Sequence, residues 1–418
     1  MPTPGKSTKL ITAPFYTSLL PSLDHITTFV VRSFAPDEEL AFLFSTESTS
    51  QSRICGAWVE VLPMLVGNGV RNSALIPAVK ALAVSILTRG PNRKASVLDG
   101  VHAHVSALRP LREAIHGAGN FFQGDLATAI MCLLLAELIL PISTNSWITH
   151  TQGISKLIQL ANPDIFLSGT YHKLFVGFRP GLVVLAFMSR KATFLALDDW
   201  VTVPFTLNPP RPIQALLSEV VVLPQLLEQL DEARYASSRA SPELVEKAAV
   251  TFLHVLQRLE LWMQTFSAES PAPLFSVRPS DHSDLCIWFP SVSVANSLTH
   301  FWAFRAMCLM QVRELGISFP DIRKEKYASM GITSGPALLG EAIELSRYIY
   351  QSTEFLMQDD MKLFGPSSVI FPLKEAYEIL KVGGKQSEED LRECRKMLDM
   401  IRRKGFHFPM FSNSDAHI

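Results

Sequence analysis

Apolar residues recur along most of the chain at the spacing of helices that bury one face. Trp58, Leu62 and Leu65 lie three or four positions apart. A second run has the same spacing and consists of Leu75, Val79, Leu82 and Ile86. Both runs predict core-facing helices. Further helices are expected at about 95–116, 125–140, 147–161, 170–196, 212–234, 242–266, 291–315, 337–357, 367–381 and 387–404.

Patterns typical of β-strands are scarce in this sequence. The best alternation is VTVPFTL at 201–207, but Pro204 cannot donate a hydrogen bond to a neighbouring strand, and more prolines follow. We therefore expect an extended segment there. The sequence predicts an all-α fold, a large multi-helix domain.

The expected organisation has three parts and two seams. The parts are an N-terminal tail with one docked helix (1–50), a helical domain (51–404) and a C-terminal tail (405–418). The two seams are Pro-rich loops or subdomain boundaries at 201–212 and 267–283, within the helical domain. The docked helix is expected to begin at Asp37, since Pro36 suits the start of a helix and acidic residues complement its dipole.

Neither a secretory signal nor a membrane anchor is expected. Prolines at positions 2, 4, 14 and 21 interrupt the N-terminal segment. The most apolar window, 126–142, contains Glu137 and Pro141 and is shorter than the roughly 20 apolar residues of a spanning helix. It predicts a buried core helix, and we expect an intracellular protein of the nucleus or cytoplasm.

The composition excludes wholesale disorder and an overall basic field that would draw the chain to DNA, so any contact with DNA would be local or through a partner. Hydrophobic residues make up 48% of the chain and charged residues 18%, against about 25% charged in typical domains. The formal net charge is −1. The five cysteines, at 55, 132, 286, 308 and 394, form no CxxC pair, so we expect reduced core thiols and neither a metal site nor a cofactor.

From about residue 53 to 380 the chain resembles a known family. The residues that carry the resemblance are Trp58, LLLAEL at 133–138, Trp147, His150, Gly153, Leu157–Ile158, Leu174–Phe175, Arg179, Arg190–Lys191, Phe194–Leu195, Trp200 and Pro372–Leu373. Their order and spacing are similar to those of the fungal-specific transcription factor domain. That domain is the helical regulatory region that follows a zinc binuclear cluster in many fungal regulators.

The chain departs from that family in its cysteines. Family members that bind DNA carry six closely spaced cysteines, which hold two zinc ions and present a helix to the major groove. Here the first cysteine, Cys55, already lies in the helical region. Direct DNA binding is therefore not expected of these residues, and the resemblance implies the regulatory half alone.

Acidic residues offer two candidates for chemistry. Glu137 lies in an apolar helix, where desolvation could make it a general acid or base, but a hydrogen-bonded or Arg-paired structural role is expected. The pairs Asp198–Asp199, Asp231–Glu232 and Asp359–Asp360 lack the DDxxD spacing with which isoprenoid cyclases hold Mg²⁺. We expect these pairs to be solvated surface groups.

Histidines and basic residues give weaker signals. His102 and His104 are two positions apart on a helix and cannot share a metal. His150 is expected to be a core residue that bridges helices where Gly153 lets them approach, and the DHSD segment at 281–284 to be a solvated loop. A terminal helix face, which nuclear import receptors could read, carries Arg392, Arg395, Lys396, Arg402, Arg403 and Lys404.

The sequence favours a regulator-like protein without its own DNA-binding domain. It would control a fungal gene set, such as a secondary-metabolite cluster, through a protein partner (another regulator or a second copy) or an apolar small-molecule ligand. The alternative is a biosynthetic enzyme on the same scaffold, such as a non-canonical terpene cyclase that would use Mg²⁺. A third alternative is that an upstream exon encodes a zinc cluster. No catalytic residue is assigned.

Overall fold

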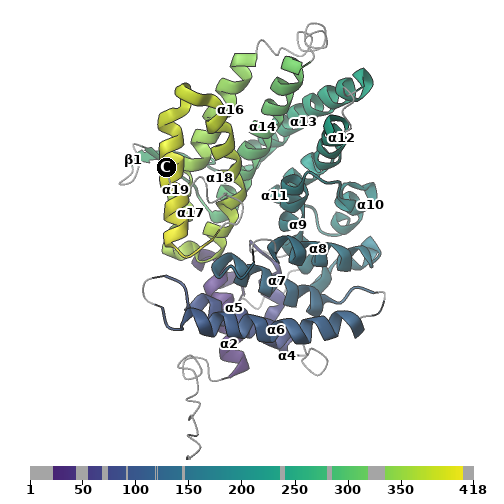
Figure 1. Ribbon diagram of the computed structural model, residues 1–418, viewed down its shortest axis with the longest axis vertical. Coiled ribbons are helices and arrows are strands. Elements are labelled where there is room, and N and C mark those ends of the chain that lie inside the picture. The colour runs from purple at the N-terminus through teal and green to yellow at the C-terminus, as the bar shows by residue number, and fades with distance from the viewer. Residues whose placement is uncertain are drawn as a thin grey trace, which may run out of the picture.

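A computed structural model describes residues 22–43, 55–67, 74–90, 93–117, 119, 121–143, 146–235, 241–279, 285–318 and 335–407. Helices dominate these residues, so the all-α prediction is confirmed (Figure 1). The exception among them is an antiparallel hairpin of β1 (Ser276–Pro279) and β2 (Leu285–Trp288), in which Val277 pairs with Ile287. The sequence analysis did not predict this hairpin.

The helices up to residue 159 form the N-terminal part, in the lower half of Figure 1. They are α2 (Leu23–Phe34), α3 (Asp37–Leu43), α4 (Trp58–Gly67), α5 (Leu75–Leu87), α6 (Val97–Gly117), α7 (Gly124–Ile139) and α8 (Ser146–Gln159). Helix α3 begins at Asp37, as predicted, but α2 is a second helix in the segment 1–50, where one was expected.

The helices after residue 211 form the C-terminal part, in the upper half of Figure 1. They are α11 (Pro212–Val220), α12 (Leu223–Tyr235), α13 (Pro242–Glu269), α14 (Val292–Ser318), α16 (Gly335–Gln351), α17 (Thr353–Leu356), α18 (Phe364–Gly383) and α19 (Glu388–Arg403). Within this part, α14, α16 and α18 pack against one another, and α19 covers α18.

Helix α9 (Gly169–Ser189) joins the two parts, since it packs against α4, α7 and α8 on one side and against α11 and α12 on the other. The backbones of α9 and α4 meet closely at Gly177, where an added Cβ would lie 2.5 Å from the Trp58 nitrogen. Arg179 is fully buried and donates hydrogen bonds to the Gln214 carbonyl and the Ser218 hydroxyl. These contacts tie α9 to α11.

Helix α9 ends at Arg190, which adopts a left-handed backbone with φ 50°. This conformation is unfavourable for a residue with a Cβ. Two hydrogen bonds from the guanidinium to Asp231, at 2.6 and 2.8 Å, hold Arg190 in place. Asp231 is therefore half-buried and paired, and our expectation that it is a solvated surface group was wrong.

Helix α7 is the core helix expected within 126–142. Nearly all of its side chains are buried, because α5, α6 and α8 surround it. Helices that are apolar on all sides adopt such positions. Glu137 is 5% exposed within this apolar environment.

Several expectations about local structure were wrong, among them the helix expected at 170–196, since α9 ends at Ser189. Residues 201–207 are not extended but belong mostly to α10 (Asp198–Thr202) and a 3₁₀ turn at Val203–Phe205. The helix expected at 212–234 is two helices, α11 and α12, and the one expected at 337–357 is α16 and α17. Other 3₁₀ turns lie at Pro163–Phe166, Phe194–Ala196, Asp359–Met361 and Gly384–Ser387.

Among the described residues, one stretch, Pro212–Ala233, is long and apolar enough to cross a membrane. It is broken between α11 and α12 at Val221–Val222. Leu216, Leu217 and Leu227 are buried in the protein core. The core helices of globular proteins show the same composition, so the stretch gives weak evidence of a membrane span.

Substitution of two glycines on one helix tests the contact between α9 and α4. Gly177→Ala places a methyl group against the Trp58 backbone, and we expect it to lower the free energy of unfolding by at least about 2 kcal/mol. Gly181→Ala is the matched control, since a Cβ there meets nothing within 4 Å. It should be neutral or stabilise by up to about 1 kcal/mol. Urea unfolding of both variants measures the difference, and equal stabilities would contradict the contact.

Candidate functional site

A cavity of about 260 Å³ lies where the N-terminal and C-terminal parts meet. Its wall is formed by α4, α7 and α8 from one part, α11, α14 and α18 from the other, and α9 between them. Most lining side chains are apolar, among them Trp58, Met131, Trp147, Phe178 and Phe371. A concave, largely apolar site with a few polar groups is typical of small-molecule binding.

Two buried histidines, His172 and His300, contribute polar groups to the wall. The Nδ1 of His172 lies 2.9 Å from the Phe166 carbonyl, and that of His300 lies 2.8 Å from the Asn296 carbonyl. Because carbonyls only accept, each Nδ1 carries a proton. Burial lowers the pKa of His172 and lowers the pKa of His300 to about 4. Both imidazoles are therefore neutral at neutral pH.

One edge of the cavity carries a thiol beside a buried carboxyl group. Cys55 and Arg211 line the cavity, and Glu39 Oε2 accepts a 2.8 Å hydrogen bond from the Cys55 backbone nitrogen. Burial, which outweighs this hydrogen bond, raises the pKa of Glu39 to about 7, and the nearby charge of Glu38 also raises it. Burial and Glu39 raise the pKa of the Cys55 thiol well above its usual value, so the thiol stays protonated.

Carboxylates are absent from the described lining of the cavity. The acidic pairs lie elsewhere: Asp198 and Asp199 are exposed at the start of α10, and Asp359 and Asp360 are exposed in a 3₁₀ turn. The expectation of solvated surface groups is confirmed for these two pairs. Asp359 also pairs with Lys404 of the basic terminal segment.

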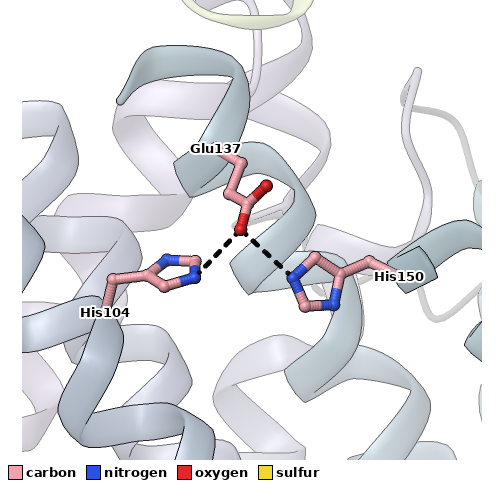
Figure 2. A group of neighbouring side chains, drawn as sticks. All are labelled: His104, Glu137 and His150. Carbon is pink, nitrogen blue, oxygen red and sulfur yellow. Dashed lines mark ion pairs between the residues drawn. The ribbon is translucent and has the colours of Figure 1, made fainter. Parts of the chain in front are cut away.

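A second site consists of three buried side chains on neighbouring helices: His104 of α6, Glu137 of α7 and His150 of α8 (Figure 2). The Nε2 atoms of both histidines point at Glu137 Oε1, at 3.1 Å for His104 and 3.5 Å for His150. Burial opposes ionisation of Glu137, but contacts with His104, His150 and Ser146 outweigh it and lower the pKa to about 2. Glu137 is thus a buried carboxylate that pairs with histidines and not with arginine.

The two sites lie on different faces of α7. Leu134, Leu135 and Leu138 line the cavity, whereas Glu137 points toward the two histidines. His102 is exposed while His104 is buried, which confirms that these two residues point apart. The His104–Glu137–His150 grouping was missed because each residue was considered alone. The sequence did contain a signal for a buried polar group, because each of the three is a polar residue in a helix whose pattern is amphipathic or apolar.

Other sequence candidates have structural roles or lie outside the described residues. An added Cβ at Gly153 would meet Ile130 at an ordinary 3.5 Å, so the helix approach there does not require glycine, contrary to our expectation. The DHSD segment at 281–284 lies outside the described residues. In α19, Met397, Leu398 and Ile401 are buried, and Arg402 pairs with Asp399.

The raised pKa of Glu39 predicts a pH dependence of stability. The folded protein keeps this proton up to about pH 7, whereas the unfolded chain releases it near pH 4.5, so wild-type stability should fall between these values by at most about 1.4 kcal/mol per pH unit. Glu39→Gln removes this loss. The stability of Glu39→Gln minus that of wild type should therefore rise from pH 4.5 to 7 and then level off.

Denaturant unfolding across this pH range measures that difference. The matched control is Glu269→Gln, because Glu269 is exposed at the end of α13. The control should follow the wild-type pH profile. A Glu39→Gln profile parallel to wild type would show that the carboxyl group ionises normally, in spite of its burial and the nearby charge of Glu38.

Comparisons with known proteins give one distant relative. No protein-family model matches the chain, and no solved structure matches it. The chain is 22% identical over 213 residues to a protein of Emericella nidulans, "Uncharacterized protein AN5342". The aligned part covers 47% of this chain and 44% of that protein, so this chain matches less than half of its relative's length.

Proposed function

We propose that this chain is a ligand-responsive regulatory protein related to the helical region of fungal transcription factors. It controls a gene set, such as a secondary-metabolite cluster, by binding another regulator or a second copy of itself. The observation that supports this proposal best is the apolar cavity between the two parts of the chain. The fungal source of the similar protein is consistent with a fungal regulator.

The position of the cavity gives a physical route from ligand to regulation. A molecule in the cavity touches α4, α7 and α8 of the N-terminal part and α14 and α18 of the C-terminal part. Ligands shift a conformational equilibrium by the difference in their affinity for its states. A ligand that contacts both parts favours the arrangement in which they close on it, and a partner bound at the surface responds to that arrangement.

The residues that line the cavity favour binding of a small molecule over metal-dependent cyclisation of a substrate. A prenyl diphosphate cyclase needs carboxylates that hold Mg²⁺ at the mouth of its apolar cavity. The described wall of this cavity contains no aspartate or glutamate, and its histidines are neutral and hydrogen-bonded to the backbone. Arg211 is the one described lining residue with a permanent charge. The wall is therefore suited to hold a largely apolar molecule.

Filling the cavity tests ligand binding directly. Gly181 lines the cavity in the middle of α9, and a side chain there has open space. Gly181→Trp should lower the affinity for a fluorescent apolar probe, 8-anilinonaphthalene-1-sulfonate, at least about tenfold, because a large side chain at this exposed lining position obstructs the cavity. Gly181→Ala should bind the probe as wild type does. Fluorescence titration of the three folded proteins measures this, and equal binding by Gly181→Trp would place the probe elsewhere.

Deletion of the gene distinguishes the proposal of a regulator from that of a biosynthetic enzyme. In the source organism, loss of the gene should lower the transcripts of its target genes together with their metabolites. Restoring Gly181→Ala should recover both, whereas Gly181→Trp should not, because it binds the ligand more weakly. RNA sequencing and metabolite profiling of the same cultures provide the measurement. Steady transcripts with one accumulating intermediate would contradict the proposal and favour the enzyme.

A further inference from the structure

The grouping of His104, Glu137 and His150 has the donor atoms of a metal site. The three ligand atoms lie within 4.8 Å of one another, and all three residues are buried. Two imidazole nitrogens and one carboxylate oxygen form a donor set that zinc accepts in proteins. The three residues come from α6, α7 and α8, and α6 and α8 each pack against α7.

The distances match those expected between ligands of one ion. Zinc lies about 2.0–2.2 Å from nitrogen and oxygen ligands, so two ligands at a tetrahedral angle are about 3.3–3.5 Å apart. Glu137 Oε1 lies 3.1 Å from His104 Nε2 and 3.5 Å from His150 Nε2. The two histidine nitrogens lie within 4.8 Å of each other, so the imidazoles would move toward each other to share one ion with Glu137.

His150 supplies an independent observation. Its Nε2 is buried and lies 3.5 Å from Glu137 Oε1, but the two atoms do not form a hydrogen bond of normal geometry. Buried polar atoms without partners are costly, because they have lost water and gained nothing in return. An ion between the three donors would satisfy this nitrogen and would also balance the Glu137 charge, which has no ion pair with lysine or arginine in the described part of the chain.

We propose that His104, Glu137 and His150 bind one divalent zinc ion that joins α6 to α7 and α8. Three protein ligands leave one tetrahedral position, which a water molecule fills. Co²⁺ accepts the same imidazole and carboxylate donors, so it serves as a spectroscopic probe of the site. The proposal is independent of the ligand cavity, because the two sites lie on different faces of α7.

Metal titration of the full chain tests this site. Protein stripped with a chelator is titrated with Zn²⁺ against a chromophoric competitor and, separately, with Co²⁺. We expect one Zn²⁺ per chain, a visible Co²⁺ spectrum of tetrahedral type that Zn²⁺ abolishes, and a higher unfolding temperature with Zn²⁺ present. His104→Ala and Glu137→Gln should each lower zinc affinity at least about 100-fold.

The matched control is His102→Ala, because His102 lies on the same helix but is exposed. It should bind zinc as wild type does. Circular dichroism shows which variants fold, and His150→Asn provides a milder substitution if an alanine variant unfolds. Failure of the wild-type protein to bind one equivalent of zinc, or equal affinity in folded Glu137→Gln, would overturn the proposal. The three buried side chains would then form a network in which the two histidines and Glu137 share protons.

Discussion

The close approach of α9 to α4 at Gly177 is the contact on which the rest of the structure depends. Helix α9 touches elements of both parts of the chain, and its distance from α4 sets their separation. A side chain at Gly177 would push α9 away from Trp58. Because both residues line the cavity, this displacement would change the shape of its wall. Arg179, two residues along and so on the opposite side of α9, joins α9 to α11 through its buried hydrogen bonds. The position of α9 thus defines the cavity.

Helix α7 separates two environments of different polarity. Its leucines face a cavity in which burial keeps imidazoles neutral, whereas Glu137 is held as a carboxylate by the polar contacts of its neighbours. The physical difference is the number of polar contacts available to each group, since burial opposes ionisation at both places. Under our two proposals, the zinc ion fixes α7 and α8, which also form part of the wall that the ligand contacts.

Helix positions were the most predictable feature, because their signal is local. The apolar spacing gave the positions of α4–α8, α13, α14, α18 and α19 to within a few residues, and Pro36 with Asp37 marked the start of α3. The apolar spacing did not predict where helices break, since α11 and α12 share one apolar pattern but are separated at Val221–Val222. The pairing of Asp231 with Arg190 also depends on residues distant in sequence.

By itself, the sequence determined the all-α class and the burial of Glu137, because periodicity and apolar surroundings act over one or two helical turns. Tertiary structure alone decided what Glu137 meets. His104 and His150 come from other helices. Their nitrogens converge on one oxygen because α6 and α8 pack against α7 at positions along its axis that bring both histidines level with Glu137. The cavity arises in the same way, since its wall combines residues from Phe34 to Phe371 that become neighbours when the chain folds.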